Sequence, residues 1–344
     1  MSLASWRWGF GASVLGATLW IGCQGGAEEP LAVGGTGAIV IESQEGLDAW
    51  AGAQKRSFVV QGDFLLEDAY LSSMEALRNL VGVEGDFAIR NNGALTDLKG
   101  LHNLSYVEGN FYILSNGLIA LQGLEQLERV GGNFEISCNF SLRDLDGLKA
   151  LRRVDGDLFV DATTELINID GLSGLTHVGG SVKIRDNKAL RDLKGLGSLS
   201  VVEGDLLLIF NGALKDLRGL NGIATIKGGL AIDEHPVLRS LEGLNALTEI
   251  GGALSINRNQ VLQNLDGLDN LRQVGKSLYI GGNALLSNLD GLAQLGQIGT
   301  GERDLMIVEL NPSLPMSAGY ELAEQLGLAE HQFIVFDNLS ASAP

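Results

Sequence analysis

Histidine and cysteine, the residue types that most often do chemistry in proteins, are few in this 344-residue sequence and lie far apart. The four histidines fall in four separate segments without a Cys-x-x-Cys motif, so no zinc-binding pattern is present. Two cysteines, Cys23 and Cys138, cannot form a disulfide framework. The sequence also lacks a Gly-x-Ser-x-Gly nucleophile motif, a phosphate-binding glycine loop and a Gly-Gly-x-Gly-x-Asp calcium repeat. We therefore expect neither a metal nor a cofactor.

Cys23 is the residue with the clearest chemical role. The preceding segment carries a single charge, Arg7, and then an apolar run of 15 residues from Trp8 to Gly22, in the order of a secretory signal peptide. That run is shorter than the ~20 residues that a membrane-spanning helix needs. The stretch LWIGC, residues 19–23, resembles the lipobox of bacterial lipoproteins. The resemblance implies cleavage before Cys23 and attachment of fatty acyl chains such as palmitate.

The N-terminal pattern predicts location and domain boundaries together. We expect a signal peptide over residues 1–22, a flexible Gly-rich tether over 23–36 and a folded unit over 37–338. The lipobox resemblance implies an exported protein that is lipid-anchored in a bacterial cell envelope, with the outer membrane or the cell surface favoured. The alternative is an ordinary signal peptide cut a few residues later, which would release a secreted protein.

Charge narrows the class of partner. Lysine and arginine number 24 against 42 aspartates and glutamates, so the formal net charge is −18. A polyanion of this size is repelled by phosphate backbones, which excludes a nucleic-acid-binding protein. Hydrophobic residues make up 45% of the chain, enough for a large core. The expected partner is a protein or a glycan, and contact with a membrane is expected only through the lipid anchor.

Internal repeats organise almost the whole folded unit. A Gly-Leu pair recurs at steps of 23 or 24 residues from Gly100 to Gly291, and a second glycine keeps the same period from Gly85 to Gly252. Two markers in phase over so many units indicate a solenoid, because each unit is too short to bury its own apolar face. Alternating apolar residues after the second glycine predict a short strand with one buried face. Leucines at every third position then predict a compact, 3₁₀-like return path.

An asparagine recurs shortly after each predicted strand. A buried amide offers two donors and one acceptor, so stacked asparagines can satisfy the backbone where each coil turns. His235 and Thr163 replace the asparagine in two coils, which we interpret as structural substitutions. The predicted structural ladder consists of Asn92, Asn116, Asn139, Asn187, Asn211, Asn259 and Asn283, and Asn311 continues its spacing.

These patterns predict a mainly β fold: a right-handed parallel β-helix or leucine-rich-repeat-like solenoid of about ten 24-residue coils, with short helical caps. The coils are expected over 58–314, the N-terminal cap over 37–57 and the C-terminal cap over 315–338. The caps should contain a lone strand at Ile39 and Ile41, helices over 45–53 and 317–328, the second with Ser317 as N-cap, and a strand over 333–336. Ten strands would make a rod about 45–50 Å long.

The repeated phrase LxxVxGxLxIxxNxxLxxLxGL resembles the receptor L domain, a leucine-rich-repeat-like β-helix found in growth-factor receptors and bacterial surface proteins. The resemblance covers nearly all of residues 38–338. It implies a binding or structural module in which the motif residues are scaffold and variable surface residues meet the ligand. The flanking cysteines of the animal receptors are missing here, so hormone recognition is not implied.

Parallel β-helices also include carbohydrate-active enzymes, which need carboxylates that converge on one cleft. Among outward strand positions, only Asp161 and Arg185 would place an acid beside a base in adjacent coils, and we interpret them as a surface ion pair. Acids that recur at the predicted turns interchange with asparagines, which favours hydrogen bonding in turns over acid catalysis. The acids are Asp97, Asp144, Asp192 and Asp216, and the asparagines are Asn168, Asn264 and Asn288.

Apolar residues at strand positions that should face solvent point to a contact site. They are Tyr112, Leu114, Phe159, Leu207, Ile209 and Phe210. The sequence therefore predicts a non-catalytic, lipid-anchored surface protein that recognises a protein or a glycan across a rigid solenoid face. The two alternatives are a carbohydrate-active β-helix enzyme and a purely structural or adhesive rod without a discrete patch.

Overall fold

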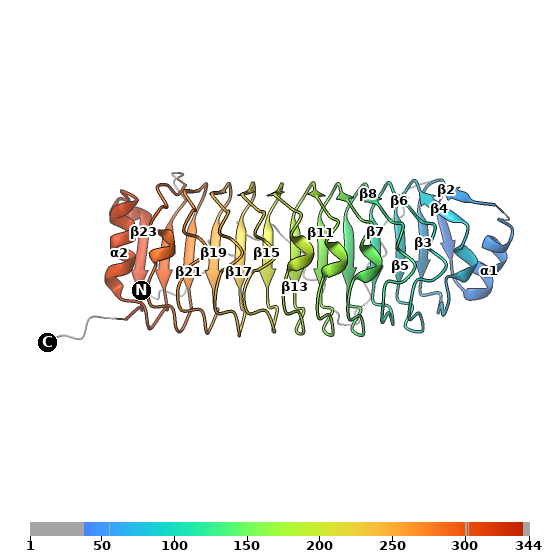
Figure 1. The fold of residues 1–344 in the computed structure, drawn as a ribbon, viewed down its shortest axis with the longest axis horizontal. Coiled ribbons are helices and arrows are strands. Elements are labelled where there is room, and N and C mark those ends of the chain that lie inside the picture. Colours follow the sequence, from blue (N-terminus) through green and yellow to red (C-terminus); the bar gives the residue numbers. More distant parts are fainter. Residues whose placement is uncertain (1–37, 55, 300, 302, 340–344) are drawn as a thin grey trace.

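A computed structural model describes residues 38–54, 56–299, 301 and 303–339. The predicted signal peptide, Cys23 and the tether lie outside the described residues. The described chain is an elongated stack of coils with one helix at each end (Figure 1). None of the helices in these ranges is long and apolar enough to cross a bilayer.

A long parallel sheet runs along the whole stack (Figure 1), and within the described ranges it contains thirteen strands. Every neighbouring pair is parallel and in register. Twelve steps of ~4.8 Å give about 58 Å, more than expected, because a strand from each cap joins eleven coil strands in this sheet. The strands, in order, are β1 (Ile39–Ile41), β3 (Phe64–Glu67), β5 (Phe87–Arg90), β7 (Phe111–Leu114), β9 (Phe134–Ser137), β11 (Leu158–Asp161), β13 (Val182–Arg185), β15 (Leu206–Ile209), β17 (Leu230–Asp233), β19 (Leu254–Asn257), β21 (Leu278–Gly281), β22 (Met306–Glu309) and β23 (Phe333–Phe336).

In most coils a short strand precedes the strand of the long sheet along the chain, and these short strands form two further parallel sheets. One contains, in order, β12 (His177–Val178), β10 (Arg153–Val154), β8 (Arg129–Val130), β6 (Tyr106–Val107), β4 (Leu80–Val83) and β2 (Phe58–Val60). The other contains β14 (Val201–Val202), β16 (Thr225–Ile226), β18 (Glu249–Ile250) and β20 (Gln273–Val274). The coils from β3 to β21 thus have two strand segments each, and the buried residue of the short one, such as Val130, precedes the repeat glycine.

The return path is built from turns and single-turn 3₁₀ helices, as the leucine spacing predicts. Successive leucines of one coil, such as Leu193, Leu196 and Leu199, are all buried. The 3₁₀ helices are η2 (Glu75–Leu77), η3 (Asp146–Leu148), η4 (Asp170–Leu172), η5 (Lys194–Leu196), η6 (Asp290–Leu292) and η7 (Glu330–Gln332), the last of which lies in the C-terminal cap.

One continuous apolar core fills the stack. Buried leucine, isoleucine and valine side chains from every coil belong to a single cluster that reaches from Ile41 to Val335. In the first coils phenylalanines stack along the axis, with Phe87 and Phe111 parallel and 5.0 Å apart between ring centroids. A single coil or cap cannot bury its own apolar side chains, so the stability of the fold depends on the stacking of neighbouring coils.

Coil-to-coil contact explains the repeat glycines. Gly100 has φ +110°, and a Cβ there would overlap the carbonyl oxygen of Met74 in the preceding coil. Gly156 has an ordinary φ, but a Cβ would overlap the side-chain oxygen of Asn133. One glycine is therefore required by backbone angle and close approach together, and the other by close approach alone.

Both caps differ in part from expectation. Helix α1 (Gln44–Gly52) begins after Ser43, whose Oγ accepts from the N–H of Gly46 at 3.0 Å. The expected lone strand is not alone, because β1 pairs with β3. Helix α2 (Met316–Gln325) follows Pro315, so Ser317 lies inside the helix and the prediction that it is the N-cap is wrong. The fixed φ of proline suits the start of a helix without a side-chain cap.

Candidate functional site

The asparagine ladder supports the turn that follows each strand of the long sheet. In most coils the backbone N–H of the ladder asparagine donates to the side-chain oxygen of the asparagine at the same position in the next coil, at 2.9–3.3 Å. These donors are Asn92, Asn116, Asn187, Asn259, Asn283 and Asn311. Each ladder asparagine also donates through Nδ2 to a backbone carbonyl in the preceding coil, at 2.7–3.1 Å. The acceptor is the third residue of the long-sheet strand of that coil, such as Leu66 of β3 for Asn92. The ladder continues past Asn283 through Asn311 to Asn338, which the sequence analysis missed because it lies in the cap.

His235 fits this ladder as a neutral ring. Its Nδ1 accepts from the N–H of Asn211 at 3.1 Å, and its Nε2 lies 3.1 Å from the carbonyl oxygen of Leu208. A ring protonated at Nε2 satisfies both bonds. Burial lowers the pKa of His235 to about 4, against the opposing effect of the two backbone hydrogen bonds. The substitution is therefore structural, and the imidazole is not available to a ligand.

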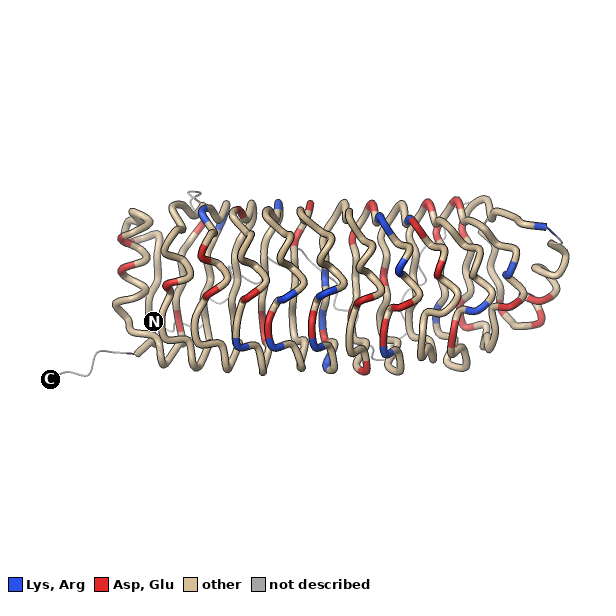
Figure 2. Tube along the Cα trace, viewed as in Figure 1, with Lys and Arg blue, Asp and Glu red and all other residues tan. Residues whose placement is uncertain are grey.

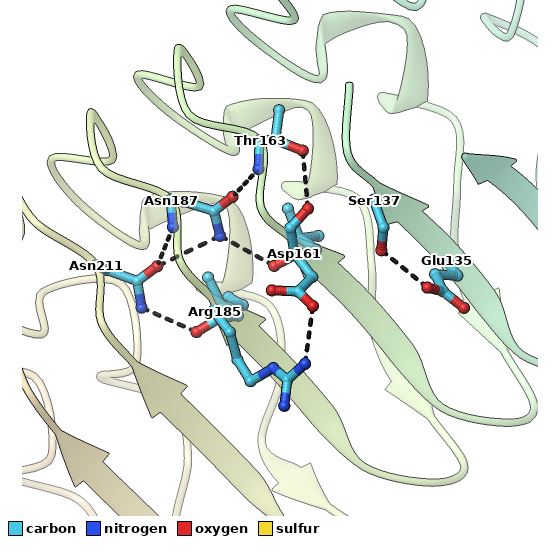
Figure 3. A network of polar contacts seen from close by, with 9 residues as sticks. Glu135, Ser137, Asp161, Thr163, Arg185, Asn187 and Asn211 are labelled. Atoms are coloured by element: carbon cyan, nitrogen blue, oxygen red, sulfur yellow. Dashed lines mark hydrogen bonds and ion pairs between the residues drawn. The ribbon is translucent and has the colours of Figure 1, made fainter. Parts of the chain in front are cut away.

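Thr163 makes fewer hydrogen bonds than the asparagines that occupy the other positions of the ladder (Figure 3). Its N–H donates to Asn187 at 3.1 Å, as in the other coils. It has no amide that could reach the preceding strand, and its Oγ1 donates to the carbonyl of Asp161 at 3.2 Å.

A second row of side chains, which the sequence analysis missed, stabilises the start of the strands. In seven successive coils the residue directly before the long-sheet strand has a side-chain oxygen that accepts a hydrogen bond, at 2.6–3.1 Å. The donor is the backbone N–H of the residue at the same position in the next coil. The acceptors are Asp63, Asp86, Asn110, Asn133, Asp157, Ser181 and Asp205. The available signal was the Asp, Asn or Ser that follows the repeat glycine.

The surface that remains for recognition is the outer face of the long sheet, which we define by the second and fourth residues of each four-residue strand. First and third residues point into the core, as in β11, where Leu158 and Val160 are buried while Phe159 and Asp161 are partly exposed. Because the strands are in register, residues at one position form a row along the solenoid axis.

The six predicted contact residues lie on or beside this face but do not form one patch. Tyr112 on β7 and Phe159 on β11 are separated in register by Glu135 on β9. Lys183 on β13 separates Phe159 from Leu207 on β15 in the same way. Leu114 and Ile209 are partly exposed at the fourth positions, and Phe210, which follows β15 with φ 59°, is 46% exposed.

The expectation that Leu207 is exposed is wrong, since only 3% of its surface is accessible. Lys183 and Ala231 flank it in register on the two neighbouring strands. Alternation along a strand predicts which face a side chain occupies, whereas the side chains beside it in the sheet determine how much of it water reaches.

The basic side chains of the outer face make cation–π contacts with its aromatic rings and ion pairs with its carboxylates. Arg90 lies 4.6 Å from the ring centroid of Tyr112, and Lys183 lies 4.4 Å from that of Phe159. Burial raises the pKa of Tyr112, with a smaller contribution from Asp86. The predicted pair of Asp161 and Arg185 is an ion pair of 2.8 Å (Figure 3).

Two carboxylates on the same face are held by hydroxyl groups. Ser137 donates to Glu135 at 2.9 Å (Figure 3), and Ser255 donates to Asp233 at 2.9 Å. Burial raises the pKa of Glu135, and it raises the pKa of Asp233 to about 6. Both carboxylates are thus partly desolvated at the surface that a partner would meet.

The recurrent acids at the turns are fully explained by local hydrogen bonds. Asp97, for example, accepts through Oδ1 from the N–H of Lys99, two residues on, at 3.1 Å. The prediction that aspartate and asparagine share this turn function is confirmed, because the other members make the same bond at 3.0–3.3 Å. Acidic residues are spread along the whole solenoid rather than gathered at one place (Figure 2).

The described side chains contain no cluster of three or more His, Cys, Asp or Glu that could hold a metal ion. Cys138, directly after β9, is buried. At the C-terminal end of the outer face, Ile334 and Phe336 on β23 are each 40% exposed. The sequence pattern predicts this strand only as part of the cap, whereas its second and fourth residues also extend the outer face.

The stacked, in-register coils define a leucine-rich-repeat-like solenoid. Solved structures with similarity include the leucine-rich repeat domain of the type III effector XCV3220 (XopL), 18% identical, covering 76% of this chain and 79% of that one, with a TM-score of 0.39. An internalin (inlF) from Listeria monocytogenes is 14% identical and covers 87% of this chain and 84% of its own, also with a TM-score of 0.39. No protein-family model and no curated protein matches the sequence.

Proposed function

We propose that this chain is a non-catalytic, lipid-anchored envelope protein that binds a partner protein through the outer face of its long sheet. The observation that carries the proposal is the in-register row of partly exposed aromatic, aliphatic and charged side chains across that face. The face is preorganised by a continuous core and by hydrogen-bonded side chains at both ends of the strands, so binding orders few groups. The resemblance to receptor L domains also supports a binding module.

A protein partner is favoured over a glycan by the state of the aromatic rings. Sugar recognition by aromatic residues requires an open ring face, and Arg90 and Lys183 each cover one face of the rings of Tyr112 and Phe159. A protein can instead use the mixed charges and the aliphatic groups of Leu114 and Ile209.

The spacing of the desolvated carboxylates argues against the carbohydrate-active enzyme. A glycosidase places its two carboxyl groups about 5–10 Å apart across the bond that it cleaves. Glu135 and Asp233 lie on β9 and β17, four strand steps apart, which is ~19 Å. Asp161, the carboxylate of the outer face on the strand next to Glu135, is paired with Arg185.

The binding experiment compares two double variants of the soluble chain from Glu28 onward in capture from the native envelope. Tyr112→Ala with Phe159→Ala removes the aromatic groups of the face, and Ile119→Ala with Leu285→Ala removes exposed apolar groups elsewhere. We expect a partner retained by the wild type and the control, and lost with the face variant. Retention of the same partner by the face variant, folded by circular dichroism, would refute the proposed surface.

The lipid anchor is a separate part of the proposal and rests on the LWIGC stretch that ends at Cys23. Two or three acyl chains bind a membrane stably, at ~0.8 kcal/mol per buried methylene. Mass spectrometry of the mature N-terminus should find a diacylglyceryl group on Cys23, and Cys23→Ala should move the protein from the detergent phase to the aqueous phase. A disulfide between Cys23 and Cys138 in the mature chain would contradict the anchor, because a thioether sulfur cannot pair.

A further inference from the structure

We call the strands from β5 to β17 the central part of the outer face. The basic side chains on this central part are already paired with carboxylates of the same chain. Arg90 contacts Glu67 at 3.1 Å, and Arg185 contacts Asp161 at 2.8 Å. Lys183 contacts Asp157, at the start of β11, at 3.0 Å. These cations therefore offer little to an acidic partner.

Glu135 and Asp233 differ from the other carboxylates of this central part. Neither has a basic side chain within 4.0 Å among the described residues, and each accepts one hydrogen bond from a serine hydroxyl. Arg90 and Arg185 are close enough to lower the pKa of Glu135, but their ion pairs are with Glu67 and Asp161. Arg258 lowers the pKa of Asp233 in the same way, but its ion pair is with Glu234. Two partly buried carboxylates thus lack an ion-pair partner of their own.

Each of these carboxylates lies beside apolar groups that could hold the stem of a long side chain. Glu135 is flanked in register by the rings of Tyr112 and Phe159. Asp233 is flanked by Ile209 and by the neutral Asn257. Lysine and arginine bury their methylene stems against apolar surface while the charged head meets a carboxylate. The raised pKa of both acids shows that the uncompensated charge is unfavourable in the free protein.

Resting on the proposed function, we propose that the partner is a basic protein segment that places one lysine or arginine at Glu135 and a second at Asp233. The two acids are four strands apart and on different rows, so the cations must be about 20 Å apart. Between them lie Lys183 and Arg185, each paired with an aspartate, so this part of the face holds no unpaired carboxylate that a further basic residue could meet. The middle of the segment must therefore be uncharged, and an extended segment spans the distance in six residue steps.

The experiment uses two peptides of identical composition and the purified full chain at low ionic strength. The spaced peptide, acetyl-Lys-Thr-Val-Thr-Val-Thr-Lys-amide, separates its ammonium groups by ~20 Å when extended. The compact peptide, acetyl-Thr-Val-Lys-Lys-Val-Thr-Thr-amide, cannot. Affinity is measured by titration with NMR detection.

The variant Glu135→Gln with Asp233→Asn removes both charges and keeps an oxygen for each serine. Its matched control, Glu128→Gln with Glu249→Gln, makes the same change of net charge at exposed glutamates outside the long sheet. We expect the site variant to lose about tenfold in affinity for the spaced peptide and the control to change by less than about twofold. The compact peptide should bind wild type more weakly than the spaced peptide does.

Equal weakening by both variants would overturn the inference, because it would show attraction to net charge alone. Equal affinity for both peptides would overturn the spacing. A melting temperature of the site variant that is no lower than that of the wild type separates lost binding from lost fold. If the aromatic variant loses its envelope partner while these peptides show no preference, the proposed surface stands and the basic-partner inference fails.

Discussion

The backbone N–H of Asn211 donates to Nδ1 of His235 at 3.1 Å, at a ladder position that other coils fill with asparagine. Burial makes the charged ring unfavourable and lowers the pKa of His235 to about 4. Two residues earlier, Asp233 has its pKa raised to about 6 by burial. Burial thus shifts the pKa values of Asp233 and His235 in opposite directions, so their effects on the pH dependence of stability have opposite signs. Variants of each residue alone can therefore separate the two effects.

His235→Asn should abolish an acid-dependent loss of stability. The folded pKa of His235 is below its unfolded value of 6.5, so its contribution is complete above pH 6.5 and is lost as pH falls toward 4. The loss is about 3 kcal/mol in wild type. Urea unfolding at pH 7 and pH 4.5 measures it, and asparagine restores the ladder bonds at both. An unchanged pH profile would contradict the neutral, buried ring.

Asp233→Asn should stabilise the folded chain at neutral pH. The folded pKa of Asp233 is above its unfolded value of 3.8, so its favourable contribution is complete below pH 3.8 and is lost as pH rises through 6. Allowing for solvent screening, the gain at pH 7 is about 2 kcal/mol. Glu234 and Arg258 are the other ionisable groups whose charges act on the pKa of Asp233.

The same measurement gives the direction of the pH slope. Between pH 4 and 6, the Asp233→Asn variant should gain stability with rising pH because His235 then dominates. His235→Asn should lose stability over the same interval. Parallel slopes in the two variants would show that the two groups do not titrate as described.

Thr163→Asn should repair the ladder. An asparagine amide at this position could donate to the carbonyl of Ile136, the third residue of β9, as its counterparts do in other coils. One additional buried hydrogen bond contributes about 1 kcal/mol. A higher urea midpoint with an unchanged m-value is expected. Thr163→Val, which removes the hydroxyl and adds no amide, is the control and should not stabilise.

Ala162→Gly and Gly282→Ala test the residue that directly precedes the ladder. Ala162 has φ 50° and Gly282 has φ 67°, so both occupy the left-handed region. Glycine adopts it without a Cβ penalty. We expect the first variant to gain about 0.5–1 kcal/mol and the second to lose at least as much, both by urea unfolding. A loss of stability in the first variant would show that entropy outweighs the strain at this turn.

The sequence by itself determined everything that repeats. The period, the strand with alternating burial, the ladder from Asn92 to Asn283 and the leucine return path are local patterns that recur at a constant spacing. Local preference and stacking agree in every coil, because each coil meets a neighbour with the same pattern. Asn311 could be placed by this spacing, whereas Asn338 could not, since the cap interrupts the period.

Only the tertiary structure decided how far each outer side chain is covered and what charge it meets. Leu207 is buried, and cations lie over the rings of Tyr112 and Phe159, because of residues 22 or 24 positions away in adjacent strands. The desolvation of Asp233 has the same origin. These properties depend on the size and charge of non-local neighbours, which vary from coil to coil and leave no periodic signal.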